Sequence, residues 1–205
     1  MNKKIIYSKL NILEANKEKS LFKLLKPLRK VGFSLIKMNQ THSSNVKTIT
    51  IIEQKKTILT LPNTDACISN LKKTLLVVKT ADCVPIIISH KSGYFATIHA
   101  GRVGSEKNIL KKTLRKLIKL CKSKQYFDIW IGPHICHSCY EINSKPKKHY
   151  NLLKENLNQI YSLLGKENNN IIKEQLCTSC DNDKYFSYRK NNKTKKRNYF
   201  LCFLT

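Results

Sequence analysis

The stretch TLLVVKTADCVPIIISHKSGYFATIHA, residues 74–100, decides the fold of this chain. It contains two apolar, β-branched runs, Thr74–Val78 and Pro85–Ile88, and a third strand-like run, Tyr94–Ile98. Residues 90–93 read His-Lys-Ser-Gly, a composition typical of a tight connection. We therefore predict that the last two runs pair as a hairpin.

Two imidazoles and one thiol lie at or near the ends of such runs. The hairpin brings Cys83 and His99 to neighbouring strand ends, whereas His42 follows the strand-like Phe33–Met38 and precedes Val46–Ile52. Zinc prefers four ligands, and a site with three protein donors leaves one position for water or substrate. If the three side chains converge, the set favours chemistry over scaffolding.

The rest of the chain alternates strands and helices, which predicts a mixed α/β fold. A helix is expected from Ser105 to about Lys122, with apolar residues on one face and lysines on the other. Its N–H-rich start would follow His99 closely and favour an anion. The remaining expected elements are a strand at Phe127–Ile131, an amphipathic stretch near Lys148–Leu164 and a closing strand at Tyr199–Leu204. No linker or repeat is visible, so we expect one domain over residues 1–205.

Composition limits the class of protein. A chain of 205 residues with 41% hydrophobic content can form a real core. The net charge of +26 would ordinarily suggest a nucleic-acid partner. However, only five of the 39 basic residues are arginines, and the basic residues are dispersed. We expect no specific nucleic-acid binding, and we interpret the basic tract at residues 190–197 as a solvated loop.

The start of the chain, residues 1–9, lacks the sustained apolar stretch of an export signal. No apolar run reaches the length of about 18 residues that spans a bilayer. We therefore expect a cytoplasmic protein with free thiols and no membrane insertion. The sequence does not indicate an oligomeric state.

Eight cysteines raise the alternative of a structural metal site. Cys136 and Cys139, and again Cys177 and Cys180, have the spacing of the two halves of a zinc ribbon. Ribbon halves are usually closer in sequence, and the flanking segments look like parts of a larger domain. A second metal site is therefore the less favoured interpretation.

Several short strings together resemble one family. They are Gln40-Thr41-His42, Thr64-Asp65-Ala66, Thr80 to Pro85, His99-Ala100-Gly101, Ile131-Gly132-Pro133, Cys139-Tyr140-Glu141, Cys177-Thr178 and Phe186-Ser187-Tyr188-Arg189. These strings run in family order from about residue 33 to the C-terminus, and the ordered set is highly specific. On these strings the chain is similar to the purine nucleoside phosphorylase family of the laccase-domain type, once described as multicopper polyphenol oxidases and also linked to peptidoglycan editing.

This resemblance implies a mixed β-sheet core flanked by helices and a zinc-dependent enzyme acting on purine nucleosides. The implied reactions are phosphorolysis of adenosine, inosine and methylthioadenosine, and deamination of adenosine. His42, Cys83 and His99 would bind zinc. Cys83, His99 and Asp82 are the expected catalytic residues, although Asp82 could equally orient a ligand or hold the turn. Asp65 ranks below the three ligands, because Asp before a strand is also common turn chemistry.

Three positions depart from the family pattern. Arg102-Val103 stands where Trp-Arg is usual, Ser43 replaces a glycine, and Lys190 replaces a second arginine. Along a regular strand a shift of one residue turns a side chain to the opposite face, so Arg102 can serve the phosphate only if its loop is irregular. We expect Arg102 and Arg189 to bind the substrate.

Two other functions stay open. Cys83 with His99 as its base would make a metal-free thiol hydrolase or amidase, with cell-wall precursors as substrates. The altered Arg102-Val103 string also allows a degenerate, noncatalytic binding protein. Copper oxidase chemistry is least favoured, because three ligands do not form the multi-histidine set that it needs.

Overall fold

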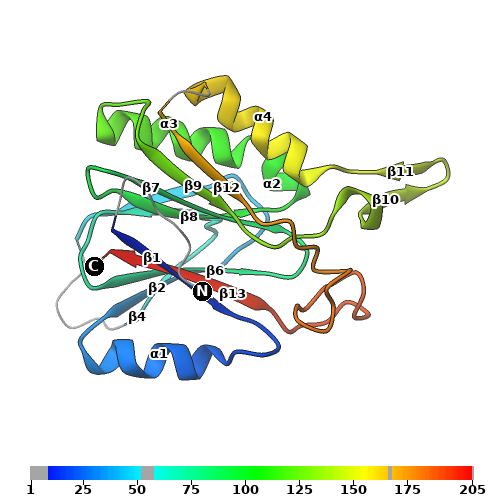
Figure 1. Ribbon diagram of the computed structural model, residues 1–205, viewed down its shortest axis with the longest axis horizontal. Coiled ribbons are helices and arrows are strands. Elements are labelled where there is room, and N and C mark those ends of the chain that lie inside the picture. Colours follow the sequence, from blue (N-terminus) through cyan, green and yellow to red (C-terminus); the bar gives the residue numbers. More distant parts are fainter. Residues whose placement is uncertain (1–8, 52–57, 166–167, 205) are drawn as a thin grey trace.

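The computed structural model describes residues 9–51, 58–165 and 168–204. Two β-sheets stack face to face, and helices cover the outer face of each, as Figure 1 shows. The predicted mixed α/β core flanked by helices is confirmed, although the core consists of two large sheets. The expectation of one domain over residues 1–205 stays a prediction.

The first sheet has five strands in the order β1-β13-β6-β2-β4. Strand β2 pairs with β4 and β6 in parallel, whereas β13 runs antiparallel to both β1 and β6. The strands are β1 (Leu10–Ala15), β2 (Ser34–Met38), β4 (Ile58–Leu61), β6 (Thr74–Thr80) and β13 (Asn198–Leu204).

The second sheet has six strands in the order β12-β9-β7-β8-β5-β3. Strands β7 and β8 form the predicted hairpin, in which Gly93 takes a positive φ of 89° at the turn. The strands are β3 (Val46–Ile49), β5 (Ala66–Ser69), β7 (Val84–His90), β8 (Phe95–Ala100), β9 (Phe127–Ile131) and β12 (Asn170–Lys173). A separate two-stranded ribbon, β10 (Glu141–Ser144) with β11 (Lys147–His149), projects from the body of the protein (Figure 1).

The apolar runs are continuous because both faces of the central strands are buried. In β6, Leu76 and Val78 point into the core between the sheets, whereas Leu75 and Val77 pack toward helix α1 (Leu21–Lys30). The other face of the six-stranded sheet packs against α3 (Ile109–Cys121) and α4 (Leu152–Leu164). The result is four layers: helix, sheet, sheet, helices.

The predicted helix Ser105–Lys122 is wrong in its first part. The chain forms a short helix α2 (Arg102–Glu106), breaks, and resumes as α3. The break lies at Asn108, whose φ of 60° is left-handed. The start of α2 at Arg102 also means that the N–H of Ser105 is already bonded within α2, to Gly101. The start of the helix therefore lies at residues 102–104, closer to His99 than predicted, and its binding of an anion stays a prediction.

Two further boundaries differ from the prediction. The helix expected near Lys148–Leu164 begins only at Leu152, because residues 147–149 pair in β11 and Asn151 caps the helix through a bond from Lys154 N–H at 2.9 Å. The strand expected to reach Ile52 ends at Ile49, and Ile52 itself lies outside the described residues.

Candidate active site

A pocket of about 480 Å³ opens where β6 of one sheet passes into β7 of the other. Its walls combine an apolar aromatic part with several cationic side chains. The lining includes His42, Cys83 and His99, the strand-connecting residues Lys79 to Asp82, and Arg102, Tyr140, Tyr188, Arg189 and Arg197. A pocket of this volume accommodates a small organic substrate.

The three predicted metal ligands converge on this pocket from separate parts of the chain. Their ligand atoms all lie within 4.8 Å of one another. His42 Nε2 is 3.8 Å from Cys83 Sγ, and the rings of His42 and His99 meet edge to face at 4.8 Å. The folded sheets therefore bring the three side chains together, which the spacing of the motifs alone could not prove.

Gly101 explains part of the His-Ala-Gly string. A Cβ atom at this position would lie 2.9 Å from Cys83 Sγ and 3.0 Å from His42 Cδ2. Any larger residue would push against both side chains. The glycine thus permits the close approach of the backbone to the cluster.

The loop that carries His42 is held from two sides. Gln40 both donates to and accepts from the backbone of Lys79, at 2.7 and 3.0 Å, which fixes the loop against β6. The carboxylate of Asp65 accepts the backbone N–H groups of three successive residues, Thr41, His42 and Ser43, at 3.1, 3.1 and 2.8 Å. This support holds His42 at a left-handed φ of 60°.

Asp65 also orients His99. Its Oδ1 lies 2.7 Å from His99 Nδ1, and the carboxylate is fully buried. Burial would raise the pKa of Asp65, but the hydrogen bonds from His99 and Ser43 hold it well below its usual range. With Nδ1 bonded to the carboxylate, His99 keeps Nε2 free to face Cys83 and His42. The sequence alone did not distinguish this role of Asp65 from ordinary turn chemistry, because the role depends on the pairing of β5 with β8, which sets Asp65 opposite His99.

Ser43, which stands where the family usually has glycine, adds to this network. Its hydroxyl donates to Asp65 Oδ2 at 2.6 Å and accepts from the N–H of Asn45 at 3.1 Å. The serine therefore gives the loop two hydrogen bonds that a glycine at this position could not make.

The cluster favours an ionised thiol. Burial opposes ionisation of Cys83, but the adjacent His99 and His42 outweigh it and lower the pKa of Cys83 to about 6. Burial likewise opposes protonation of His99, while the Cys83 thiolate and Asp65 favour it and raise the pKa of His99 to about 9. A thiolate is the form of cysteine that binds zinc and also the form that acts as a nucleophile.

The donor set fits a zinc ion. It combines one thiolate with two imidazoles, and a carboxylate bonds to the far nitrogen of one imidazole, as is usual around metal-bound histidine. His42 is exposed on the pocket side, so the cluster is open to a substrate.

Asp82 lies beside the cluster but is engaged elsewhere. Its Oδ1 accepts from the hydroxyl of Thr178 at 2.8 Å and its Oδ2 from the backbone N–H of Arg189 at 2.7 Å. Both oxygens are therefore occupied, and the residue takes a left-handed φ of 89°. This geometry favours holding the turn and the 187–189 loop over acting as a base.

Arg102 lines the pocket because it begins α2 and does not continue strand β8. The irregular backbone that its role required is thus present. Its Nη1 lies 3.1 Å from Glu106 Oε1, one helical turn later, in a pair exposed to solvent. Any anion that entered the pocket would therefore compete with Glu106 for this guanidinium.

Two more arginines face the pocket. Arg189 donates from Nη1 to the carbonyl of Glu141 at 2.6 Å, and its guanidinium lies 5.5 Å from the ring centre of Tyr140. Arg197 was assigned to a solvated basic loop, yet it lines the pocket and its Nη1 donates to the carbonyl of Thr194 at 2.6 Å. Nothing in the lysine-rich tract distinguishes this residue before the loop folds back.

Fold and site together define a four-layer α/β protein with a His-Cys-His cluster in a cationic pocket. A family model described as multi-copper polyphenol oxidoreductase laccase matches residues 15–162 and 143–204, and the chain belongs to this laccase-like family.

Relatives in this family carry two kinds of name. A protein of Campylobacter jejuni named purine nucleoside phosphorylase Cj1217c is 32% identical over 170 residues, which cover 78% of this chain and 73% of the relative. Adenosine deaminase RL5, from an unknown prokaryotic organism, is 26% identical over 185 residues, covering 76% of this chain and 70% of the relative. The solved structure of YlmD from Geobacillus stearothermophilus has a TM-score of 0.81 at 17% identity and covers 97% of this chain and 93% of its own. That structure supports the fold.

None of the helices in the described part of the chain is both long and apolar enough to cross a membrane. The eight cysteines are all free thiols in the structure. The four cysteines of the two Cys-x-x-Cys strings nevertheless converge, contrary to the less favoured status given to a second metal site.

Proposed function

We propose that this protein is a zinc-dependent purine nucleoside enzyme, which cleaves adenosine, inosine and methylthioadenosine with phosphate and deaminates adenosine. The observation that carries the proposal is the convergence of His42, Cys83 and His99 in one cationic pocket. The names of the relatives support the substrate class. Zinc bound by the three side chains would supply Lewis acidity near neutral pH.

The remaining walls of the pocket suit the two parts of the substrate. Tyr140 and Tyr188 offer aromatic surface on which a purine can stack. Arg102, Arg189 and Arg197 provide the positive charge that inorganic phosphate needs. Arg189 lies 5.5 Å from the ring centre of Tyr140, so the pocket offers aromatic surface and positive charge side by side, as a base joined to a ribose beside phosphate would need.

In phosphorolysis, a phosphate oxygen attacks C1′ of the ribose as the bond from C1′ to the purine nitrogen breaks. The bonding electrons leave with the purine, which gains a proton, and ribose 1-phosphate is the second product. Positive charge builds on the ribose in the transition state, so an anion held beside it is favourable. The arginines position that anion, and the Thr178–Asp82–Arg189 bonds keep Arg189 at the pocket wall.

In deamination, water adds to C6 of adenosine, the C6–N bond breaks, and ammonia leaves to give inosine. This reaction has no need of phosphate. The same pocket serves both reactions only if the purine can present either its C6 edge or its glycosidic bond to the cluster.

A chromatographic product assay tests the proposal. Zinc-loaded protein receives adenosine with and without phosphate, alongside chelated protein and the variant His99→Ala. We expect adenine only with phosphate, inosine whether or not phosphate is added, and neither product from the chelated protein or the variant. A well-folded, zinc-loaded protein that forms no product from adenosine, inosine or methylthioadenosine would contradict the nucleoside assignment.

A specific arrangement favours one second function. Cys83, His99 and Asp65 form a thiol–imidazole–carboxylate series, with His99 bonded to Asp65 at 2.7 Å and a lowered pKa at Cys83. Such a series supports a thiol hydrolase or amidase that acts on cell-wall precursors. Full turnover of an amide substrate by metal-free protein, abolished by alkylation of Cys83, would favour this function over the first.

A further inference from the structure

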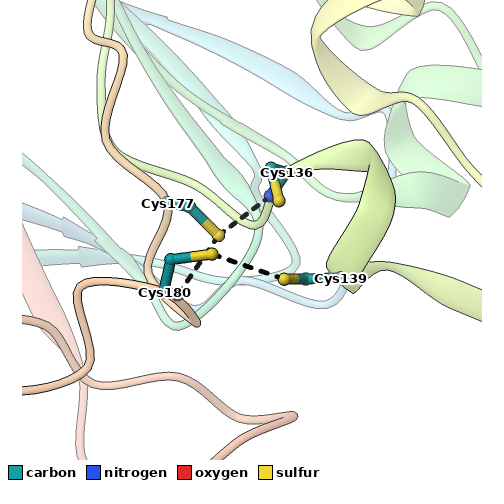
Figure 2. A group of neighbouring side chains, drawn as sticks. All are labelled: Cys136, Cys139, Cys177 and Cys180. Atoms are coloured by element: carbon teal, nitrogen blue, oxygen red, sulfur yellow. Dashed lines mark hydrogen bonds between the residues drawn. The ribbon is translucent and has the colours of Figure 1, made fainter.

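The two Cys-x-x-Cys strings lie outside the pocket, and its chemistry does not use them. They are 38 residues apart between Cys139 and Cys177, yet their four Sγ atoms lie within 4.8 Å of one another (Figure 2). We propose that Cys136, Cys139, Cys177 and Cys180 bind a structural zinc ion, separate from the one at His42, Cys83 and His99.

Sheet topology explains the convergence. Strands β9 and β12 are parallel neighbours, with Ile131 opposite Lys173, so the chain leaves both strands at the same edge of the sheet. A short parallel bridge between His134 and Cys177 continues this pairing beyond the strands. Each string therefore begins within a few residues of a common strand end, and the pairing delivers the two halves to one place.

The local backbone presents the thiols of each pair together. Residues His137–Cys139 form a 3-10 turn in which the N–H of Cys139 donates to the carbonyl of Cys136 at 3.2 Å. On the other side, the carboxylate of Asp181 accepts the N–H of Cys177 at 2.9 Å, and the N–H of Asp181 returns to the carbonyl of Cys177 at 2.8 Å. Hydrogen bonds within each turn therefore close both turns without a metal ion.

The sulfur atoms have the environment of metal thiolates. Cys177 Sγ accepts two backbone N–H groups, from Cys136 at 3.2 Å and from Cys180 at 3.4 Å (Figure 2). Cys139 and Cys180 approach to 3.5 Å between their sulfurs. Four thiolates at the usual zinc–sulfur distance of 2.3 Å would be about 3.8 Å apart, so a tetrahedral ion needs only small shifts. Four thiolates and no open position are the mark of a structural zinc site.

This zinc would fix one wall of the active-site pocket. Tyr140, which lines the pocket, follows Cys139 directly. Thr178, which bonds to Asp82, follows Cys177 directly. The ion would therefore join the loop that carries Tyr140 to the loop that holds Asp82.

Zinc content of the protein purified with a reductant tests the proposal. We expect about two zinc ions per chain in the unaltered protein, and one in Cys180→Ser, in Cys136→Ser and in His42→Ala. The double variant His42→Ala, Cys180→Ser should hold none. Cys121→Ser, a cysteine of α3 that belongs to neither cluster, should keep the full content.

These variants separate the two metal sites. Zinc that falls in Cys180→Ser but not in His42→Ala supports this site even if the nucleoside pocket proves to be metal-free. Zinc that is unaffected by Cys180→Ser and Cys136→Ser overturns the proposal. A Cys139–Cys180 disulfide that persists under reductant with zinc present also overturns it. Such a disulfide lowers the intact mass by two units.

If a serine variant fails to fold, a histidine variant still tests the proposal. Cys180→His keeps a Cys₃His donor set and should restore both folding and the zinc content. In His42→Ala, which should hold only this ion, removal of zinc by a chelator should release four additional reactive thiols and increase hydrogen exchange at residues 136–140 and 177–178, with no change in α1. Exchange that stays the same at both loops would overturn the proposed role at the pocket wall.

Discussion

Asp65 is the residue on which the candidate active site most depends. It is fully buried, it accepts the backbone of the His42 loop, and it fixes His99. A carboxylate offers four acceptor positions and no donor, which matches an environment made only of N–H and O–H groups. An amide of the same shape would place two donors among them.

We therefore predict that Asp65→Asn weakens zinc binding at the pocket about 10- to 100-fold, the usual cost of losing a carboxylate behind a metal ligand. Competition with a chromogenic chelator measures this affinity. The matched control is Asp128→Asn, another buried aspartate in the same sheet, which bonds to Asn170 and lies away from the cluster. Equal zinc affinity in both variants would contradict the role given to Asp65.

Arg102 gives a second prediction at the scale of single residues. Its pair with Glu106 is about 40% exposed on both sides, and such pairs contribute less than about 1 kcal/mol. Glu106→Gln should free the guanidinium for phosphate and lower the KM for phosphate by up to about fivefold, with little change in the KM for the nucleoside. Arg102→Gln should act in the opposite direction. If the KM for phosphate in both variants equals that of the unaltered protein, Arg102 does not hold the anion.

The motifs in the sequence identified His42, Cys83 and His99, but not the residues that organise them. Recognising Asp65 required the register of β5 against β8, and recognising Arg197 required the path of a lysine-rich loop. Both depend on contacts between distant segments, which a local pattern does not contain. For Asp82 the sequence left open a base, a residue that orients a ligand and a residue that holds the turn, and the hydrogen bonds to both of its oxygens favour the last of these.

At the scale of elements, the β7–β8 hairpin contains a buried histidine. His90 is 2% exposed, packs against Phe127, and lies 2.8 Å from Ser92 Oγ through Nδ1. Burial lowers the pKa of His90 below its ordinary 6.5, with the backbone of Gln125 opposing the effect and the charge of Lys91 adding to it. The folded state therefore binds this proton less readily than the unfolded state.

Stability from His90 is thus present above about pH 6.5 and is lost as the pH falls below it, because only the unfolded chain then gains the proton. We expect the free energy of unfolding in urea to decrease from pH 7 to pH 5, with a smaller slope in His90→Gln. Tyr94→Phe, in the same hairpin, leaves the imidazole in place and should retain the original slope. A slope that is identical in His90→Gln would show that other groups cause the acid sensitivity.

The break between α2 and α3 shows how far periodicity can predict an element. The apolar face predicted for this helix is buried in the structure, at Ile109, Leu110, Leu114 and Leu117. It did not reveal the break, because Asn108 is polar, exposed and compatible with a helix. Its left-handed conformation lies between the end of α2 and the start of α3.

Asn108→Ala should therefore lower the free energy of unfolding by about 1 kcal/mol, since alanine resists a positive φ. Asn108→Gly should be neutral or slightly stabilising. Lys107→Ala, at a neighbouring position with an ordinary φ of −84°, is the control for loss of an exposed side chain. Urea unfolding of the three variants measures the differences. An equal effect of alanine and glycine at position 108 would exclude backbone strain as the cause.

At the scale of the whole molecule, the sheet order decides which sequence patterns meet. A metal site at the two Cys-x-x-Cys strings was the less favoured interpretation, partly because of their distance along the chain, yet the parallel pairing of β9 with β12 brings them together. The fold class followed from the apolar runs, but strand order and the division into two sheets did not. Those features come from the packing of strands with two buried faces, whose local sequences look alike.

The charge of the whole chain leads to the last prediction. A net charge of +26 on 205 residues repels itself in the compact state, and few carboxylates are present to offset it. Salt screens this repulsion, with a Debye length that falls from about 30 Å at 0.01 M to about 8 Å at 0.15 M. Raising sodium chloride from 0.01 to 0.5 M should therefore stabilise the protein by about 1 kcal/mol or more, which corresponds to a Tm higher by about 2–4 °C in a chain of this size.

Helix α1 supplies the control for this prediction, because it carries exposed Lys23, Lys26 and Lys30 and no acidic residue in its first turn. Replacing these three lysines with glutamate reduces the net positive charge without touching either cluster or the core. This variant should have a higher Tm at low salt than the unaltered protein and a smaller gain on adding salt, as calorimetry would show. If added salt raises the Tm of both proteins equally, the salt effect comes from general exclusion of the ions from the protein surface. The excess of lysine then does not measurably destabilise the fold.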